Sequence, residues 1–200
     1  SDHLDPKEVR RIDPFIQYGL IAANQSISDS GILEYESLNK EKVGINFGAG
    51  IGGIQTIENN KMILESKGHK KVSPFFVPGS IVNMISGLVS IKHGFMGPNT
   101  SVVTACSTGN HCIGTAARSI ACGEADVMIA GGAEMASTPL SISGFISARA
   151  LSTNPNPESA CRPWDKDRDG FILADGAGSL VLEDYEHAKQ RNAHIYAEII

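Results

Sequence analysis

The stretch SVVTACSTGNHCIGTAARSIACGEADVMIAGG, residues 101–132, decides the fold. Its first five residues, 101–105, are rich in β-branched side chains and predict a buried strand. Helical periodicity begins after Ser107 and ends at Gly123, and residues 127–130 predict a second buried strand, closed by a pair of glycines at 131 and 132. A strand, a helix and a strand within about 30 residues are typical of a parallel α/β unit. We therefore predict an α/β fold.

The segments before this unit continue the alternation of helix and strand. Apolar residues recur at helical intervals over residues 14–30 and stop at Gly31, which predicts a helix. Residues 43–47 predict a short strand that runs into a glycine-dense turn at 48–53. The remaining predictions are a helix at about 54–66, an irregular stretch at 72–79, and a helix at 81–91 whose Gly87 indicates close packing on a neighbour.

The segments after this unit predict one more strand and one more helix, at 179–183 and about 184–191. The chain then ends inside another strand-like run, 195–200, and its first six residues contain no strand. Because a domain rarely ends within a strand, we expect the chain to be a piece of a longer protein, or a partly determined one.

Composition limits the classes of function. With 200 residues and 42% apolar content, the chain can bury a core without metal or disulfide support. A net charge of −5 makes a nucleic-acid groove or a polybasic membrane patch improbable. The sequence shows neither a secretory signal nor an 18-residue apolar run. We expect no membrane insertion and a cytoplasmic location, or the stroma or matrix of an organelle in a eukaryote.

Cys106 is the candidate nucleophile, because it lies between the predicted strand and its helix. The N-terminus of a helix offers unpaired N–H groups and a positive dipole end, which stabilise a thiolate. Small neighbours, among them Ala105 and Gly109, leave room for a carbonyl group beside a backbone N–H donor. The arrangement is consistent with a cysteine that holds an acyl group as a thioester.

A second interpretation of Cys106 stays open, since free cysteines are often small buried hydrophobes. Packing is the better explanation for Cys112 and Cys122, which fall within or at the end of the helix. None of the six histidines lies in a turn that would present it to a thiol, and His111 is on the wrong face of the helix. Thioester chemistry needs an acid–base partner, so the sequence leaves that partner unassigned.

Two segments partly match motifs for binding a dinucleotide and calcium, but neither match is complete. Gly48, Gly50 and Gly53 match the dinucleotide fingerprint, but the acidic residue expected about 20 residues later is absent. Residues 165–170 copy half of a calcium loop, yet its twelfth position is Gly176 in place of glutamate. The four cysteines match no metal or redox spacing. We expect no cofactor and no metal.

Several motifs, in the same order along the chain, carry a resemblance to a known family. They are Val103 to Gly109, Ala125 to Glu134, Ala148 to Ser152, Arg162 to Asp165, and Arg168 to Phe171. From about residue 7 to 200 the sequence closely resembles the beta-ketoacyl-[acyl carrier protein] synthases of the elongating type II fatty-acid class.

The resemblance implies a thiolase-like layered αβαβα fold, here mainly its N-terminal half, and usually a homodimer. Residues 1–194 would form that half without its first strand, and residues 195–200 would begin the C-terminal half. Cys106 would accept an acyl chain from acyl carrier protein, and malonyl carrier would extend the thioester by two carbons. The family's two catalytic histidines and its lysine would lie in the second half.

The resemblance also assigns roles to individual residues. Ile51 and Phe145 match residues that line or gate the acyl pocket. Five basic residues match the patch that receives the acidic carrier protein, although each is also compatible with a solvated charge: Lys70, Lys71, Arg149, Arg10 and Arg11.

Other functions stay open. One is a relative that works on coenzyme A esters, such as a thiolase, or a polyketide ketosynthase. Another is a non-catalytic partner that sets chain length. Such partners typically lack the nucleophile, so the presence of Cys106 argues against this last function.

Overall fold

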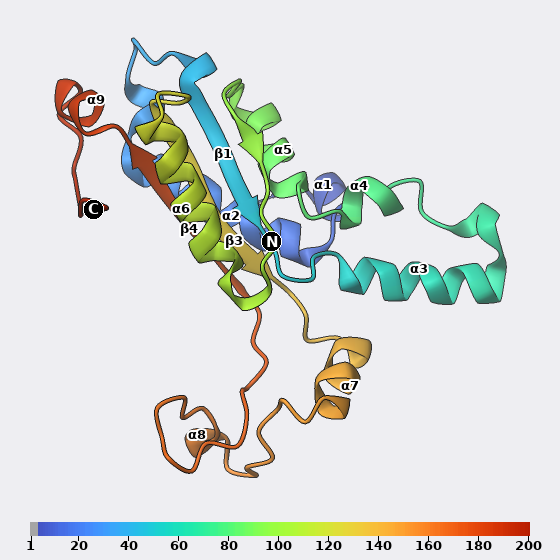
Figure 1. The fold of residues 1–200 in the computed structure, drawn as a ribbon. Helices are drawn as coiled ribbons and strands as arrows, with labels where there is room; N and C mark the ends of the chain where they lie inside the picture. The colour runs from blue at the N-terminus through green and yellow to red at the C-terminus, as the bar shows by residue number, and fades with distance from the viewer. Residues whose placement is uncertain (1–3) are drawn as a thin grey trace.

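The computed structural model describes residues 4–200, and its centre is one four-stranded sheet in the order β2-β1-β3-β4 (Figure 1). β1 pairs in parallel with both β2 and β3, whereas β4 runs antiparallel to β3. The α/β prediction is confirmed. The strands are β1 (Val43–Gly48), β2 (Asn99–Thr100), β3 (Val127–Glu134) and β4 (Gly176–Glu183).

Helices cover both faces of this sheet, with α2 on one face and α6 on the other (Figure 1). Within the described residues, no helix has the length and apolar character needed to cross a membrane. The helices are α1 (Pro6–Val9), α2 (Pro14–Ser30), α3 (Ile54–Lys67), α4 (Phe76–Ser80), α5 (Met84–His93), α6 (Thr108–Ala121), α7 (Pro139–Ser147), α8 (Pro157–Ala160) and α9 (Tyr185–Gln190). Four 3₁₀ turns are η1 (Ile32–Glu34), η2 (Lys40–Lys42), η3 (His69–Lys71) and η4 (Ala105–Ser107).

The predicted bounds of α2 are confirmed. Residues next to each end of this helix determine where it begins and ends. The Asp13 side chain accepts a hydrogen bond from the Phe15 N–H, and Pro14 occupies the first turn, where no donor is lost. Gly31 ends the helix in the left-handed conformation, with a φ of 61°. The predicted strand at 43–47 and helix at 54–66 are confirmed as β1 and α3, each extending one residue further.

The two faces of the sheet are packed differently. Toward α2 and α5, side chains alternate inward from β1 and β3 and form the main core. Toward α6, a smaller cluster contains Ala116, Ala125, Met128 and Ala130. The largest fully buried side chains of the main core are Phe15, Phe47, Phe95, Ile16, Leu20, Ile27, Ile32, Ile45, Ile85, Ile129 and Val43.

The prediction that Gly131 and Gly132 close the second strand is wrong, because both glycines pair with β1 and with β4, and β3 continues to Glu134 alongside β4. A Cβ on Gly131 would lie 2.7 Å from the Phe47 ring and 2.2 Å from the Gly178 carbonyl oxygen. These glycines therefore belong to the strand and permit close approach of the β1 side chains and of β4.

The predicted buried strand at 101–105 is also wrong. The strand before the helix is β2, which has only two residues and is exposed, and Val103 is 52% exposed. β-branched residues favour a strand only where a neighbour pairs with them, and β2 lies at an edge of the sheet. The helix predicted to follow is confirmed as α6, so the parallel β2–α6–β3 unit stands.

Gly87 does not mark the close helix contact that was predicted, since a Cβ at this position would come no closer than 4.0 Å to a side chain, that of Met84 in the same helix. The close contact involves Gly19 of α2, where a Cβ would lie 2.5 Å from Ile85 Cδ1. The predicted helix at 81–91 forms as α5, shifted to Met84–His93.

Three further predictions concern short segments. The stretch predicted to be irregular, 72–79, contains the start of the short helix α4. Near the C-terminus, β4 and α9 confirm the last predicted strand and helix. The run at 195–200 is exposed and forms no strand among the described residues, so that prediction is wrong.

Between β3 and β4 the chain makes an excursion, residues 135–175, that carries α7 and α8 away from the sheet (Figure 1). Polar contacts hold it at its base, where Asp175 accepts from the Ala136 and Ser137 N–H groups at 2.9 and 3.1 Å. Further out, the Ser152 hydroxyl donates to Asp169. This bond, together with the bonds from Thr153 and the charge of Arg162, lowers the pKa of Asp169 to about 2. Little apolar surface is buried there, and Trp164 is 96% exposed.

Candidate active site

Cys106 lies in the 3₁₀ turn η4, directly before α6, and its side chain is exposed. Ala105 has a φ of 53°, in the left-handed region that a residue with a side chain rarely occupies. Such a conformation costs about 1–3 kcal/mol and is found preferentially at functional sites. The turn therefore presents the sulfur outward at the start of a helix, as predicted, and not within closed packing.

Side chains on both sides of Cys106 hold this turn. The Thr108 hydroxyl accepts from the Thr104 N–H at 2.9 Å, and the Ser107 hydroxyl donates to the Thr104 carbonyl at 2.8 Å. Ser107 is the N-cap residue of α6, yet its side chain does not cap the helix. The first-turn N–H groups of α6 thus have no bond to the Ser107 hydroxyl and favour an anion beside them.

A cavity of about 760 Å³ opens beside Cys106. Ile51 comes to it from the turn after β1, and Phe145 comes from α7. Phe145 packs edge to face on Phe171, with ring centroids 5.1 Å apart. The structure therefore brings the predicted nucleophile and both predicted pocket residues to one mostly apolar space.

Small residues on the α6 side of the sheet make room for this arrangement. A Cβ on Gly48 would lie 2.2 Å from the Val102 carbonyl oxygen and 2.6 Å from Thr108 Cγ2. A Cβ on Gly132 would lie 3.1 Å from the Cα atom of Gly109. The N-terminal turn of α6 can therefore approach the ends of β1 and β3 only because these positions have no side chain.

Glu134, the last residue of β3, also lines the cavity. Its two carboxylate oxygens accept hydrogen bonds from the N–H groups of Ile51, at 2.8 Å, and Gly52, at 3.0 Å. The turn that carries Ile51 is thus tied to the neighbouring strand by a carboxylate. This contact is part of the site, and the sequence analysis did not identify it.

Glu58 of α3 makes a corresponding contact with α7. Its Oε1 atom accepts from the Leu140 N–H at 3.1 Å and from the Thr138 hydroxyl at 2.5 Å. A carboxylate at this position also complements the positive end of the α7 dipole. α3 begins directly after the turn that carries Ile51, so one helix links the two walls of the cavity.

The other cysteines differ from Cys106. Cys112 is buried in α6, and burial raises the pKa of its thiol, as expected for a packing residue. The prediction that Cys122 packs inside is wrong, because it is exposed at the C-cap of α6. Cys161 is exposed as well, and all four cysteines are free.

Among the described residues that line the cavity, none is a histidine. His111 is oriented toward Thr104, with 2.5 Å between Nδ1 and the threonine Oγ1. This agrees with the sequence analysis, which left the acid–base partner of Cys106 unassigned.

The five predicted carrier-binding residues lie on three different elements. Lys70 and Lys71 belong to η3 after α3, Arg10 and Arg11 follow α1, and Arg149 follows the C-cap residue of α7 with a φ of 54°. None of them lines the Cys106 cavity.

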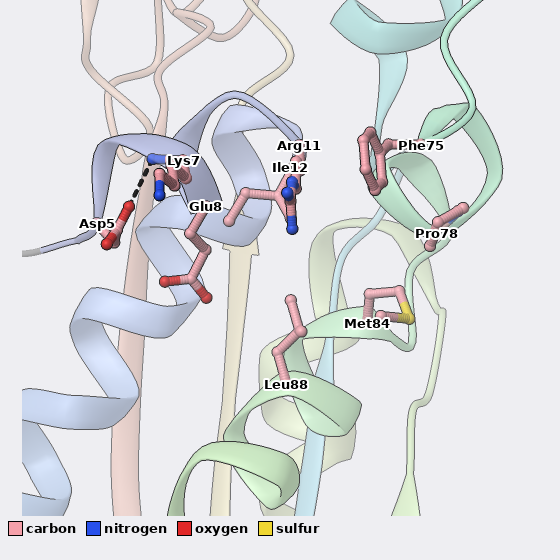
Figure 2. Close-up of a pocket in the computed structure, with 9 residues that line it drawn as sticks. All are labelled: Asp5, Lys7, Glu8, Arg11, Ile12, Phe75, Pro78, Met84 and Leu88. Atoms are coloured by element: carbon pink, nitrogen blue, oxygen red, sulfur yellow. Dashed lines mark hydrogen bonds between the residues drawn. The ribbon is translucent and has the colours of Figure 1, made fainter.

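Arg11 faces Phe75 across a second cavity, of about 410 Å³, between α1, α4 and α5 (Figure 2). The guanidinium carbon lies 4.8 Å from the ring centroid. This contact brings Arg11 to the segment that follows Lys71, and it is compatible with one shared basic surface.

Glu134 and Glu58 were missed because each bonds to residues 80 or more positions away in the chain. The one available signal was the position of Glu134, two residues after the pair of glycines that was predicted to close the strand. Side chains alternate between the faces of a strand, so correct strand bounds would have placed Glu134 on the α6 side.

Curated relatives match this chain along its whole length. The 3-oxoacyl-[acyl-carrier-protein] synthase 2 of Vibrio cholerae is 57% identical over 201 residues, which cover 100% of this chain and 48% of the relative. The protein of the same name from Coxiella burnetii is 58% identical over 98% of this chain and 48% of its own length. The chain thus spans about half the length of these relatives.

Solved structures show the same fold. A beta-ketoacyl synthase from Burkholderia phymatum superposes with a TM-score of 0.84 at 30% identity, over 96% of this chain and 47% of that one. A type II polyketide ketosynthase in complex with its acyl-carrier protein, AntDE:AntF, gives a TM-score of 0.76 at 27% identity, over 96% of this chain and 53% of that one. These neighbours confirm the predicted thiolase-like fold class.

The family model described as "Beta-ketoacyl synthase, N-terminal domain" matches residues 2–188, including the Cys106 turn, the glycine turn and Glu134. The predicted boundary at residue 194 stays a prediction. With the motifs, the fold and the relatives in agreement, the chain belongs to the beta-ketoacyl synthase family, as part of its N-terminal domain.

Proposed function

We propose that this protein is a condensing enzyme of fatty-acid elongation, in which Cys106 accepts an acyl chain from acyl carrier protein. The observation that carries the proposal is the exposed sulfur at the start of α6, beside an apolar cavity of about 760 Å³. A cavity with Ile51 and Phe145 on its walls suits a hydrocarbon chain better than a polar substrate.

The chemistry proceeds in two transfers. Cys106 loses its proton, and the thiolate attacks the carbonyl carbon of the acyl-carrier thioester. The bond from this carbon to the carrier sulfur breaks, and the carrier thiolate leaves and takes up the proton that Cys106 gave up. Malonyl carrier then loses CO₂, and the resulting carbanion attacks the Cys106 thioester, which forms the carbon–carbon bond and releases the Cys106 thiolate. The helix start stabilises this thiolate as both attacking and leaving group.

Intact-mass spectrometry tests the first transfer. When the intact protein is incubated with acyl-loaded carrier, its mass should increase by one acyl group, and the Cys106→Ala variant should gain none. Cys161→Ala is the matched control, because Cys161 is also exposed but does not line the cavity. Undiminished acylation of Cys106→Ala would show that the site is wrong.

We propose that the carrier protein docks on the basic residues near α3 and α1, with Lys70, Lys71 and Arg11 at its centre. Carriers with phosphopantetheine are strongly acidic, so these charges provide complementarity on an enzyme of net charge −5. The double variant K70E/K71E should raise KM for a carrier-bound donor and leave KM for a small thioester unchanged. An equal effect on both donors would contradict docking at this surface.

We propose that the protein forms a homodimer. The support is the short edge strand β2, which is exposed and followed by the half-exposed Val103. Such edges are usually covered in folded proteins. Sedimentation of the intact protein should give twice the chain mass, and Val103→Lys should shift it toward the monomer.

We also propose a cytoplasmic, stromal or matrix location, because all four cysteines are free.

Polyketide ketosynthase activity is a second candidate, favoured by the structural similarity to AntDE:AntF. The 57–58% identity with two 3-oxoacyl-[acyl-carrier-protein] synthases favours fatty-acid elongation. Product analysis separates them. A condensing enzyme of elongation needs a reduced acyl chain as its substrate for each extension, whereas a polyketide enzyme extends unreduced ketoacyl chains. Acylation from coenzyme A esters at the carrier-dependent rate would instead indicate a thiolase-like enzyme.

A further inference from the structure

Glu134 lies at the cavity but has no part in the two transfers proposed above. It follows Met128, Ala130 and Gly132 on the α6 side of β3, so strand alternation directs it toward Cys106 and away from the main core. Both of its oxygens accept from consecutive main-chain N–H groups, those of Ile51 and Gly52, at 2.8 and 3.0 Å. This geometry binds the backbone of a turn and leaves the Ile51 side chain free to line the cavity.

The packing of Gly50 shows how closely this turn is held. A Cβ at Gly50 would lie 2.8 Å from Glu134 Oε2 and 3.3 Å from the carbonyl oxygen of Ala105. Gly50 therefore packs closely, on the side where a side chain would point, against both the Glu134 carboxylate and the residue that precedes Cys106. The turn can lie this close to both groups only because position 50 has no side chain.

We propose that Glu134 is a positioning residue that fixes the turn 49–53, so that Ile51 forms a defined wall of the cavity and limits the acyl chain that Cys106 can hold. The inference rests on the proposed function, because a chain-length limit matters only if Cys106 carries an acyl chain. Hydrogen bonds to a charged acceptor are roughly twice as strong as neutral ones, which suits a carboxylate to this task.

A different role for Glu134 would be proton exchange with Cys106. The observed bonds favour positioning, since an ionised carboxylate only accepts hydrogen bonds and both oxygens already do so from the turn. The two roles differ in what they predict. Loss of a proton acceptor lowers the acylation rate for all donors equally, whereas loss of positioning changes the ratio between long and short donors.

The test compares Glu134→Gln with Glu124→Gln, which is the same substitution before the start of β3. There, among the residues that the structure describes, the Glu124 carboxylate accepts a bond from the Ser119 hydroxyl and none from the backbone of a turn. kcat and KM are measured with short and long acyl-carrier donors, together with the rate of Cys106 alkylation by iodoacetamide. For Glu134→Gln we expect the long-to-short ratio of kcat/KM to change by about tenfold or more, because two charge-assisted bonds are weakened. Alkylation should stay within about threefold of the unmodified protein, and Glu124→Gln should match that protein throughout.

Removing the Ile51 side chain shows whether Glu134 acts through it. In an Ile51→Ala background, Glu134→Gln should no longer change the long-to-short ratio, because the wall that it positions is gone. The inference is overturned if Glu134→Gln alone changes the ratio by less than about twofold, or if the same change persists without Ile51.

Hydrogen exchange in the unmodified protein keeps the inference testable if the Glu134 variants do not fold. The N–H groups of Ile51 and Gly52 should exchange slowly, and exchange at the rate of an open chain would overturn the inference. Failure of the proposed function has a different signature. In that case the unmodified protein would not become acylated at Cys106, although the two N–H groups would still be protected.

Discussion

The two sides of the sheet are built from the same strands but from different kinds of residue. On the side of α2 and α5, β1 contributes Val43, Ile45 and Phe47, all fully buried in the main core. On the side of α6, the alternate positions of β1 are Gly44, Asn46 and Gly48. The first side supplies apolar burial. The second side buries less apolar surface. Its small residues leave space for the start of α6, the turn 49–53 and the cavity beside Cys106.

The largest expected effect comes from removing a large side chain on the α2–α5 side. Phe47→Ala should lower the free energy of unfolding by about 3–5 kcal/mol, because a fully buried ring is replaced by a cavity. Urea denaturation measures the loss, with Phe145→Ala as the control on the half-buried ring of the α6 side. A similar loss in both variants would remove the distinction between the two sides.

Adding a single methyl group tests the α6 side. Gly48→Ala should cost about 1–3 kcal/mol, since the new Cβ would lie 2.2 Å from the Val102 carbonyl oxygen. It should also change the alkylation rate of Cys106, because Val102 and Thr108 must shift. A Cβ at Gly114 in α6 would meet no atom within 4 Å outside the backbone of its own helix in the described part of the chain, so Gly114→Ala is the matched control. That variant should gain about 0.5–1 kcal/mol from helix propensity, and a loss there would contradict the steric explanation.

Asn46 lies on the same side and is fully buried in the central strand β1. Within residues 4–200, neither its Oδ1 nor its Nδ2 atom has a hydrogen-bond partner. Asn46→Val should raise the free energy of unfolding by about 1–2 kcal/mol, because it removes buried polar atoms that are unpaired. Thermal unfolding of both proteins at one pH measures the gain. A destabilised variant would indicate that the amide is bonded in solution.

The smallest effect is a pH dependence on the α2–α5 side. Burial lowers the pKa of His93 below its ordinary value of 6.5, and the charges of Lys92 and Lys40 lower it further. Below about pH 6.5 the unfolded chain therefore binds a proton that the folded protein does not bind. The free energy of unfolding falls as the pH drops from about 6.5 toward the lowered pKa, and at higher pH it does not depend on this group. His93→Gln should remove this slope from the difference between the two unfolding curves. An unchanged slope would assign it to another group.

Much of the fold could be predicted because its signals are local. The caps and periodicity of α2, the apolar run of β1 and the strand–helix–strand unit around α6 all depend on nearby residues. The errors arise where tertiary pairing decides. Residues 101–105 have strand propensity but no partner strand on their outer side, and Gly131 and Gly132 resemble a turn yet pair on both sides.

The candidate site divides in the same way. Cys106 could be identified because a helix start and small neighbours are visible in the sequence. Ile51 and Phe145 required the family resemblance. Glu134 and Glu58 could be identified only in three dimensions, since their partners are 80–83 residues away. Periodicity carries no information on which distant backbone a carboxylate will bind.

Helix α3 has a further consequence for how substrate range can change. Its 14 residues span about 21 Å, from the turn with Ile51, past Glu58 and its bonds to α7, to the basic residues of η3. A rigid rod of that length converts a small tilt at its solvent-exposed surface into a movement of both walls of the Cys106 cavity. Under the proposed function, selection for products of altered length should therefore enrich substitutions on the outer surface of α3, which does not line that cavity.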